Sequence, residues 1–288
     1  MSNQPHAIST LAIPINGAEE FSMSSLSFFQ VVSAILLFLA VMALPTRGIA
    51  STRPADPAGV DSYFSRLGDS TDAGERITSL STAFLGMPYE PATLIGGPDV
   101  PERLVVKLDS FDCMTFLETI EALRRSEDFK QFTPNLVKVR YFHADIAYES
   151  RRHFFSDWLI DSGGYLEDVT SIVAPEQSEI VTKMLNRKGS DGLWLPDIPV
   201  TSRQIRYVPG ERIDHDVLGR LRTGDFIGIF SLRKGLDVSH VGIAIRSENG
   251  LFFRHASSSK DVKKVTDVPL AGYLAERPGM IVFRALDP

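Results

Sequence analysis

The last third of the chain carries the clearest folding signal, a series of apolar runs bounded by turn residues. The run "GDFIGIFS" follows a Gly-Asp pair, and "VSHVGIAIRSENGLFFRHASS" holds two runs around a turn rich in Ser, Asn and Gly. A further run, "GMIVFRAL", lies close to the C-terminus. Short apolar runs with such boundaries predict β-strands, and short turns join antiparallel neighbours. We therefore expect a mainly antiparallel sheet in this part of the chain.

Helical patterns come earlier in the chain. The stretch "GERITSLSTAFLG" places Ile77, Leu80 and Phe84 at helical spacing and stops at Gly86, and "CMTFLETIEALRRS" also predicts a helix. The alternation in "RLVVKL", residues 103–108, favours a strand or an extended segment, and "TKMLNRK", residues 182–188, suggests a short helix. Helices first and strands later predict an α+β fold.

Composition narrows the class of protein. The chain has 288 residues, of which 43% are hydrophobic and 23% charged, values typical of a globular protein. Its net charge of -6 and its pI of about 5.6 argue against a nucleic-acid partner, because such proteins carry a basic surface. No second linker or internal repeat interrupts the residues after about 72, so we expect one domain over 73–288.

One segment near the N-terminus departs from the globular pattern. Residues 26–44, "LSFFQVVSAILLFLAVMAL", contain no charged side chain, and small residues follow at Gly48 and Ala50. This arrangement predicts either a secretory signal peptide or an uncleaved membrane anchor. We assign 1–50 to an N-terminal extension with this signal or anchor and 51–72 to a linker. The protein is then expected to be exported to the periplasm or cell envelope.

Cys113 is the only cysteine of the chain, so it has no partner for an internal disulfide. It follows Asp112, a favoured N-cap residue, and would occupy the first position of a helix. Unpaired N–H groups and the helix dipole there favour a negative charge, which predicts a lowered thiol pKa and a nucleophile. Phe116, Leu117 and Ile120 share its helical stripe, so a buried core cysteine is the other interpretation.

A cysteine nucleophile needs a base, and two histidines lie on consecutive predicted strands. His240 shares a strand face with Gly242 and Ala244, a small-residue face that would leave open space, and His255 ends the next strand. A four-residue loop, 246–249, would set the two histidines opposite each other. A two-residue turn at Asn249-Gly250 would pair His255 with Ala244 and leave His240 about 13 Å along its strand. Catalysis favours the first register.

Five stretches in order carry a resemblance to a known family: "GMPYEPATLIGG", "FDCMTFLE", "TGDFIGIF", "SHVGIAI" and "FFRHAS". They resemble motifs of the NlpC-type papain-like cell-wall cysteine peptidases. The run "SRRHFFSDWLIDSGGYLEDVT" is similar to the branch called N-acetylmuramoyl-L-alanine amidase-like. The resemblance extends from about Gly74 to the C-terminus. It implies a papain-like α+β fold with the cysteine at a helix N-terminus, packed on the sheet.

The resemblance also implies roles for particular residues. Cys113 matches the nucleophile, His240 the base and His255 the residue that orients the base, while Tyr89 matches a tyrosine that assists the oxyanion or substrate. Met114 and Thr115 replace the Ser-Gly of the peptidases, and the amidase-like branch is similar in having threonine there. Further substrate-binding candidates are Asp112, His153 and Asp157. The run that holds Arg151, Arg152, His153 and Asp157 either binds a peptide carboxylate or amine or is a solvated or salt-bridged helix.

The implied activity is hydrolysis of an amide bond in peptidoglycan or a muropeptide through an acyl-enzyme, without a cofactor. The bond is either muramoyl–L-alanine or a stem-peptide bond such as γ-D-glutamyl to a diamino acid. Two alternatives come from other classes of protein. One is a wall-binding module without catalysis. The other is a zinc site formed by Cys113, His240 and His255, which are three ligands of the types that catalytic zinc uses; we expect no metal.

Overall fold

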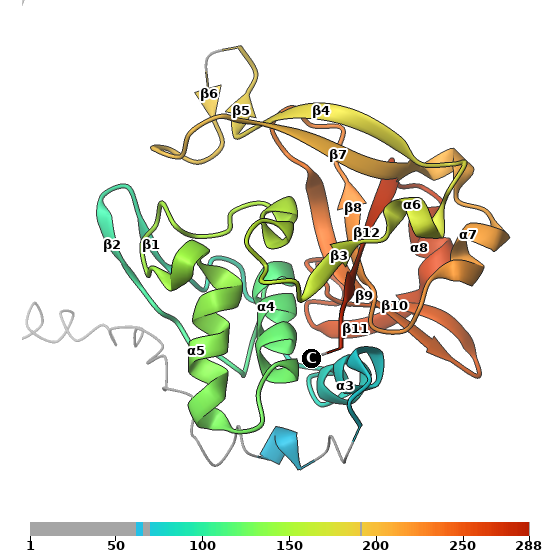
Figure 1. Ribbon diagram of the computed structural model, residues 1–288, viewed down its shortest axis with the longest axis horizontal. Helices are drawn as coiled ribbons and strands as arrows, with labels where there is room; N and C mark the ends of the chain where they lie inside the picture. The colour runs from blue at the N-terminus through green and yellow to red at the C-terminus, as the bar shows by residue number, and fades with distance from the viewer. Residues whose placement is uncertain (1–61, 66–69, 191, 288) are drawn as a thin grey trace, which may run out of the picture. The chain divides into compact units, whose positions relative to one another are not determined.

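An antiparallel sheet with helices on both faces forms the fold (Figure 1). The computed structural model describes residues 62–65, 70–190 and 192–287. The helices are α3 (Ala73–Thr82), α4 (Cys113–Arg124), α5 (Phe129–Arg140), α6 (Thr170–Val173), α7 (His215–Arg220) and α8 (Leu270–Leu274), with 3-10 turns η1 (Phe142–Ala144), η2 (Phe155–Leu159) and η3 (Gly210–Arg212). The strands are β1 (Ile95–Gly97), β2 (Val100–Arg103), β3 (Leu166–Asp168), β4 (Glu179–Leu185), β5 (Arg187–Lys188), β6 (Gly192–Leu193), β7 (Thr201–Pro209), β8 (Phe226–Phe230), β9 (Val238–Ser247), β10 (Gly250–Ala256), β11 (Val265–Pro269) and β12 (Gly279–Ala285).

The main sheet has the strand order β11-β10-β9-β8-β12-β7-β4, and β3 pairs with β12. Neighbouring strands in it run antiparallel. Two small hairpins, β1–β2 and β5–β6, lie outside it. The predicted α+β class with a mainly antiparallel sheet is confirmed in this coarse form.

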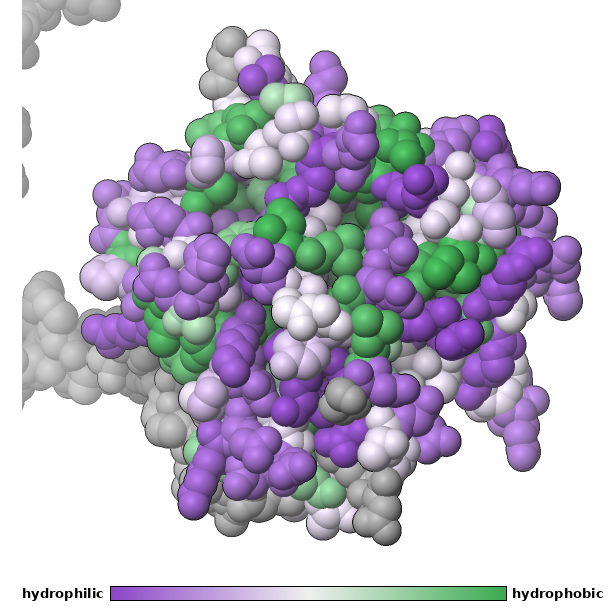
Figure 2. All heavy atoms as spheres, in the orientation of Figure 1, coloured by the Kyte–Doolittle hydropathy of each residue, from purple (hydrophilic) through white to green (hydrophobic). Residues whose placement is uncertain are grey.

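Each face of the sheet packs against its own hydrophobic core, because successive side chains of a strand point to opposite faces. On β9, Val241 and Ile243 belong to the core that includes side chains of α3, α4 and α5. Ala244 between Ile243 and Ile245 belongs to the second core, which includes side chains of α6, α7 and α8. Burial of these two sets leaves a mostly hydrophilic surface with separate apolar patches on the face shown in Figure 2.

Aspartate begins four of the helices, and this explains where they start. In each case the side-chain carboxylate accepts a hydrogen bond from the backbone N–H three residues later, which satisfies a donor that the helix leaves unpaired. The pairs are Asp72 with Glu75, Asp112 with Thr115, Asp128 with Gln131 and Asp214 with Val217. The start of α4 at Cys113 is therefore set by local sequence.

Two buried ion pairs fix α4. Arg140 of α5 donates through Nε to Glu118, with 2.7 Å between Nε and the carboxylate oxygen, and both side chains are 3% exposed. Arg124 binds Glu121 through two hydrogen bonds of 2.8 Å within α4 itself. Removing one partner of a buried ion pair strongly lowers the stability of the fold, because the other charge stays buried without compensation. The pair between Glu118 and Arg140 therefore ties α4 to α5.

The predicted helix over 182–188 is wrong, because most of these residues belong to β4, which pairs with β7 along its whole length. Lys183 occupies an inward-facing position of β4, where an apolar residue would be expected. The sequence therefore lacks the alternation of apolar and polar residues that predicts a strand. The Nζ of Lys183 donates to the carbonyl oxygen of Ser231 at 2.5 Å and lies 4.6 Å from the centre of the Phe230 ring.

Residues 103–108 form no strand beyond Arg103, where β2 ends. The carbonyl oxygen of Val105 accepts a hydrogen bond from Arg140 Nη1 at 2.7 Å. A side-chain donor thus takes the place of a strand partner, so the extended alternative fits this stretch better than the strand.

The apolar run 26–44 lies outside the described residues, so the signal or anchor and the boundaries at 50 and 72 stay predictions. Among the residues that the structure does describe, no helix has the length and apolar character needed to cross a membrane. These residues all fall within one compact unit, Thr52–Pro288.

Replacing Arg140 by methionine is expected to lower the free energy of unfolding by about 3–5 kcal/mol, because the Glu118 carboxylate stays buried without its partner. Urea unfolding followed by circular dichroism measures the change. The double variant Glu118→Leu with Arg140→Met should recover most of the loss, since it removes both charges. A control at the exposed pair of Arg212 and Glu179, Arg212→Ala, should cost less than about 1 kcal/mol. A cost below about 1 kcal/mol for Arg140→Met would contradict the argument.

Candidate active site

The local sequence holds Cys113 at the first position of α4. The carboxylate of Asp112 accepts a hydrogen bond from Thr115 N at 2.8 Å, and the Thr115 hydroxyl accepts one from Asp112 N at 3.0 Å. These two bonds form a capping box, in which both residues satisfy each other's backbone donors. The capping box therefore explains why threonine, rather than the glycine of the peptidase motif, fits at position 115. It fixes the turn that presents the cysteine.

The apolar stripe of α4 is part of the hydrophobic core, and Cys113 lies at the end of this stripe. Phe116, Leu117 and Ile120 are fully buried, whereas Cys113 is only partly buried at the rim of the same core. The helix packs against β9 and β10. The stripe thus anchors the helix on the sheet and leaves the thiol at its end.

The thiol lies against β9. The backbone N–H of Val241, the residue after His240, interacts with it, as do the N–H groups of Met114 and Cys113 itself. Burial nevertheless raises the pKa of Cys113 to about 12, and the negative charge of Asp112 adds to this effect. The lowered thiol pKa predicted from the sequence is therefore wrong, because removal of water outweighs the N–H groups of the helix start.

A two-residue turn at Glu248 and Asn249 joins β9 to β10, and it produces neither of the two registers considered for the sequence. Gly250 pairs with Ser247, and the ladder continues to Arg254 opposite Ile243. One more step along this register sets His255 beside Gly242, two residues from His240.

The two imidazoles meet across the strands from this offset. His240 Nε2 lies 2.7 Å from His255 Nδ1, a hydrogen-bond distance, and the ring planes are nearly perpendicular at 88°. Diagonal neighbours on adjacent strands lie within reach of such side chains. The register that the structure adopts thus brings the two histidines together as effectively as direct pairing would.

Aromatic side chains hold the histidine pair. Phe253 stacks on His255, with 4.9 Å between ring centres and an angle of 22°, and Tyr273 of α8 lies 5.2 Å from the His255 ring. Gly242 makes this possible, since a Cβ there would lie 2.5 Å from the Phe253 ring. The open space expected beside Gly242 is therefore filled by Phe253.

Both histidines are neutral at neutral pH. Burial lowers the pKa of His240 to about 3, and positive charge on His255 and Arg277 acts in the same direction. Burial and the charge of Arg277 lower the pKa of His255 to about 4. The Cys113 thiol and both imidazoles are therefore uncharged at neutral pH.

Tyr89 lies at the same site. It forms a bridge with Phe111, just before the start of α4, and its backbone N–H donates to the carbonyl oxygen of Lys263 at 2.9 Å. Burial raises the pKa of its phenol, and negative charge on Cys113 and Asp112 raises it further. The Tyr89 phenol and the Cys113 thiol are therefore close enough to influence each other electrostatically. Asp112 is adjacent through the cap described above.

Polar atoms of His153 and Asp157 are used within the fold. His153 Nε2 lies 2.8 Å from the carbonyl oxygen of Tyr148. The Asp157 carboxylate accepts from Phe154 N at 2.9 Å and from Arg203 Nη1 at 2.5 Å. The ion pair between Asp157 and Arg203 agrees with the salt-bridged alternative for the run 151–157. Substrate binding by the two residues stays a prediction.

A cavity of about 330 Å³ opens beside the histidine pair on the side of Tyr273 and Arg277. Its lining includes His240, His255 and the serines at 257–259. Arg277 lies over the Tyr273 ring, with 4.6 Å from its guanidinium carbon to the ring centre. The sequence analysis missed both residues, because no motif marks the segment 273–277.

The lining of the histidine cavity offers hydroxyl groups and one guanidinium, donors suited to an anionic group. It lies directly against the two imidazoles.

The described residues contain no group of three His, Cys, Asp or Glu side chains placed to hold a metal ion. His240 Nε2 and His255 Nδ1 face each other, so these two nitrogens cannot both be directed at a shared ion. The geometry therefore gives no support to the zinc alternative.

Comparisons with known proteins identify the family. The family described as N-acetylmuramoyl-L-alanine amidase-like matches residues 79–280. A crystal structure of an N-acetylmuramoyl-L-alanine amidase from Bacteroides uniformis ATCC 8492 is 30% identical, with a TM-score of 0.64, and covers 74% of this chain and 99% of its own. No curated protein matches the chain.

A protein from Legionella pneumophila str. Philadelphia 1 is 23% identical, with a TM-score of 0.68, and covers 80% of this chain and 94% of its own. At this identity the likeness concerns the fold alone. The membership of NlpC-type peptidases and the papain-like fold, which the sequence resemblance implied, are not tested by these comparisons.

Alkylation of Cys113 by iodoacetamide is expected to be slow at neutral pH, because the thiolate is the reactive form and a pKa of about 12 leaves little of it. The rate should rise about tenfold per pH unit between pH 6 and 9, and at pH 7 it should be about a thousandfold below that of the urea-unfolded chain. Mass spectrometry of the labelled protein measures both rates. A plateau already reached below pH 7 would instead indicate a thiolate–imidazolium pair.

Proposed function

Because the chain belongs to the N-acetylmuramoyl-L-alanine amidase-like family, we propose that it is a cysteine amidase that cleaves an amide bond of peptidoglycan. The family match and the Bacteroides uniformis structure support an amidase-like activity on this polymer. The nucleophile, the base and the bond are the specific parts of the proposal. We assign the bond to muramoyl–L-alanine, after the family.

The hydrogen bond between His240 and His255 is the observation that carries the proposal. It occupies Nε2 of His240 and so leaves Nδ1 as the nitrogen that can accept a proton. His240 can use Nδ1 as a base only if its own proton sits on Nε2, which then donates to Nδ1 of His255. His255 is thus a positioning residue that selects the tautomer and holds the ring.

The proposed reaction assigns a step to each of these groups. Cys113 Sγ attacks the amide carbonyl carbon and forms an S–C bond, while its proton passes to His240 Nδ1. The C–N bond then breaks, and His240 returns the proton to the leaving amine. Water attacks the resulting thioester and gives a proton to His240. The S–C bond then breaks, the carboxylic acid leaves, and His240 returns the proton to Cys113 Sγ. Since the resting groups are neutral, proton transfer accompanies the attack.

The oxyanion of the tetrahedral intermediate is stabilised at the start of α4. The N–H of Thr115 is bonded to the Asp112 carboxylate, and that of Phe116 is bonded to the Asp112 carbonyl at 3.1 Å. The N–H groups of Cys113 and Met114 contact the thiol in the resting site, and we assign them to the oxyanion once Sγ is bonded to the carbonyl carbon. Tyr89 adds a hydroxyl donor from the facing segment.

The cavity beside the histidines receives an anionic group of the substrate. Arg277 supplies a positive charge there, and the serines at 257–259 supply hydroxyl donors. Stem peptides of peptidoglycan carry free carboxylates, which match these donors. The proposal includes export, because peptidoglycan lies outside the cytoplasmic membrane; the run 26–44 would direct it.

Replacing Cys113 by alanine is expected to abolish release of soluble products from purified peptidoglycan while the unfolding midpoint changes little, since the side chain is small and only partly buried. Mass spectrometry of the digest identifies the bond. Free muramoyl carboxyl groups with intact stem peptides support the proposed bond, whereas shortened stems would indicate the stem-peptide alternative. Full turnover by Cys113→Ala would overturn the cysteine mechanism, and binding without turnover by the native chain would favour a wall-binding module.

Replacing Arg277 by glutamine is expected to raise KM about tenfold with a smaller change in kcat, because a charge-assisted hydrogen bond to the substrate is lost. Kinetics on a soluble muropeptide measure both constants. The matched control Lys234→Gln removes the same charge from an exposed position and should leave KM unchanged. An unchanged KM for Arg277→Gln would show that the substrate anion binds elsewhere.

A further inference from the structure

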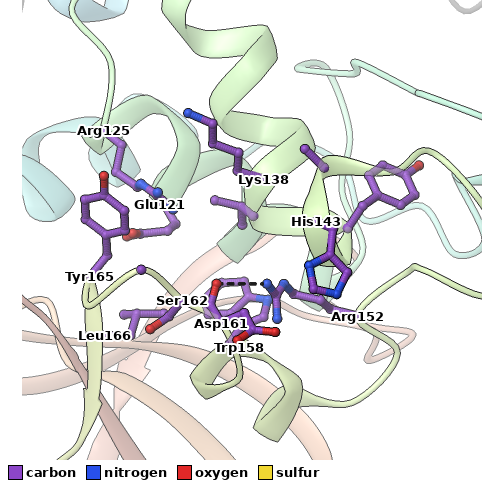
Figure 3. A pocket seen from close by; sticks show the side chains of 14 residues that line it. Glu121, Arg125, Lys138, His143, Arg152, Trp158, Asp161, Ser162, Tyr165 and Leu166 are labelled. Atoms are coloured by element: carbon purple, nitrogen blue, oxygen red, sulfur yellow. Dashed lines mark hydrogen bonds between the residues drawn. The ribbon is translucent and has the colours of Figure 1, made fainter.

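A second cavity, of about 380 Å³, lies between the C-terminal end of α4, α5 and the segment that follows η2 (Figure 3). Its volume is within the range of small-molecule sites. Glu121 and Arg125 line it, and these residues follow Cys113 by up to 12 positions along the helix axis. At 1.5 Å per residue this separation is about 18 Å, so the cavity is distinct from the candidate active site.

Arg152 is a buried cation at this cavity without an acidic partner. Its guanidinium donates to the carbonyl oxygens of Asp157 at 2.6 Å, Ile160 at 2.5 Å and Asp161 at 3.4 Å, and the side chain of the residue is 5% exposed overall. Within the described part of the chain, no carboxylate forms a salt bridge with it; the Asp157 carboxylate binds Arg203 instead. A buried charge without a counter-ion is costly, and a bound anion would offset this cost.

Trp158 lines the same cavity and has an unused donor. It is 2% exposed, and among the described residues its indole N–H is the buried side-chain polar atom that has no hydrogen-bond partner. Buried polar groups normally have partners, so such an atom calls for an explanation. An acceptor group bound in the cavity would supply one.

The charges around the opening favour an anion. Figure 3 shows Arg125, Lys138 and Arg152 around the same space. The carboxylate of Glu121 is already neutralised by its two hydrogen bonds to Arg124, which leaves exposed Asp161 as the acidic side chain at the rim. Burial lowers the pKa of Arg152, the negative charges of Asp157 and Asp161 oppose this effect, and the positive charge of Arg125 adds to it. The cavity is therefore electropositive.

The backbone at this cavity is unusual as well. His143, Ala144 and Asp161 line it, and all three have positive φ values, between 49° and 56°. Residues other than glycine adopt this conformation at a cost, and such positions concentrate at functional sites. The surrounding structure thus holds the lining in a defined shape.

We propose that this cavity binds an oxyanion, a carboxylate or phosphate group on a ligand no larger than a monosaccharide unit. Arg152 and the Trp158 indole N–H meet the anion from the buried side, and Arg125 and Lys138 meet it from the open side. The proposal does not depend on the amidase activity.

Trp158 provides a direct probe, since the chain contains one other tryptophan, Trp194. In the full-length Trp194→Phe variant, inorganic phosphate and N-acetylmuramic acid are titrated against chloride at matched ionic strength, with tryptophan emission and calorimetry as readouts. We expect saturable binding of at least one of the two anions, and which one binds identifies the source of the oxyanion. Absence of binding by both readouts overturns the proposal. So does equal binding of neutral N-acetylglucosamine.

Charge variants then test the location. Lys138→Gln should raise the Kd about tenfold, whereas Lys130→Gln, a matched change on the same helix away from the cavity, should leave it unchanged. Asp161→Asn should lower the Kd, because it removes the acidic side chain at the rim. An equal Kd for Lys138→Gln and the parent protein would place the anion elsewhere and overturn the proposal. Cys113→Ala should bind the anion normally, which separates this result from any failure of the amidase assignment.

Discussion

The candidate active site depends on the register between β9 and β10. The turn at Glu248 and Asn249 sets this register, and a shift by one residue would turn one histidine to the opposite face of the sheet. The hydrogen bond between His240 and His255 exists only in this arrangement. Gly242 completes it, because the Phe253 ring occupies the space where a side chain would lie. Local turn geometry therefore decides whether the base is oriented.

Burial decides the protonation states of the same groups. It raises the pKa of the thiol and lowers the pKa values of both imidazoles, so all three groups stay neutral until a substrate arrives. Asp267 would favour a charged His255, but its carboxylate is held by Arg254 through hydrogen bonds of 2.8 and 2.7 Å. In the proposed mechanism, charge then develops during the attack itself. The capping box fixes the N–H groups at the start of α4 before that charge develops, as electrostatic catalysis requires.

Local sequence predicted part of this structure and missed what depends on long-range contacts. The antiparallel strands near the C-terminus and the helix that begins after Asp112 follow from turn residues, alternation and capping. The helix expected at 182–188 was wrong because inward-pointing Lys183 interrupts the alternation. The predicted lowering of the thiol pKa was wrong, because the segments that bury Cys113 are distant from it in the sequence. Tyr273 and Arg277 approach the histidines only through the packing of α8, which no local pattern predicts.

The two proposed sites lie at opposite ends of α4, and the packing of this helix argues that they act independently. Communication between sites requires an element with two arrangements of similar free energy. In α4 the stripe of Phe116, Leu117 and Ile120 is fully buried. A shift of this helix would also break the ion pair between Glu118 and Arg140. A displaced α4 would leave charges unpaired in the core, at a cost of about 3–5 kcal/mol. The helix is therefore a rigid support for both sites.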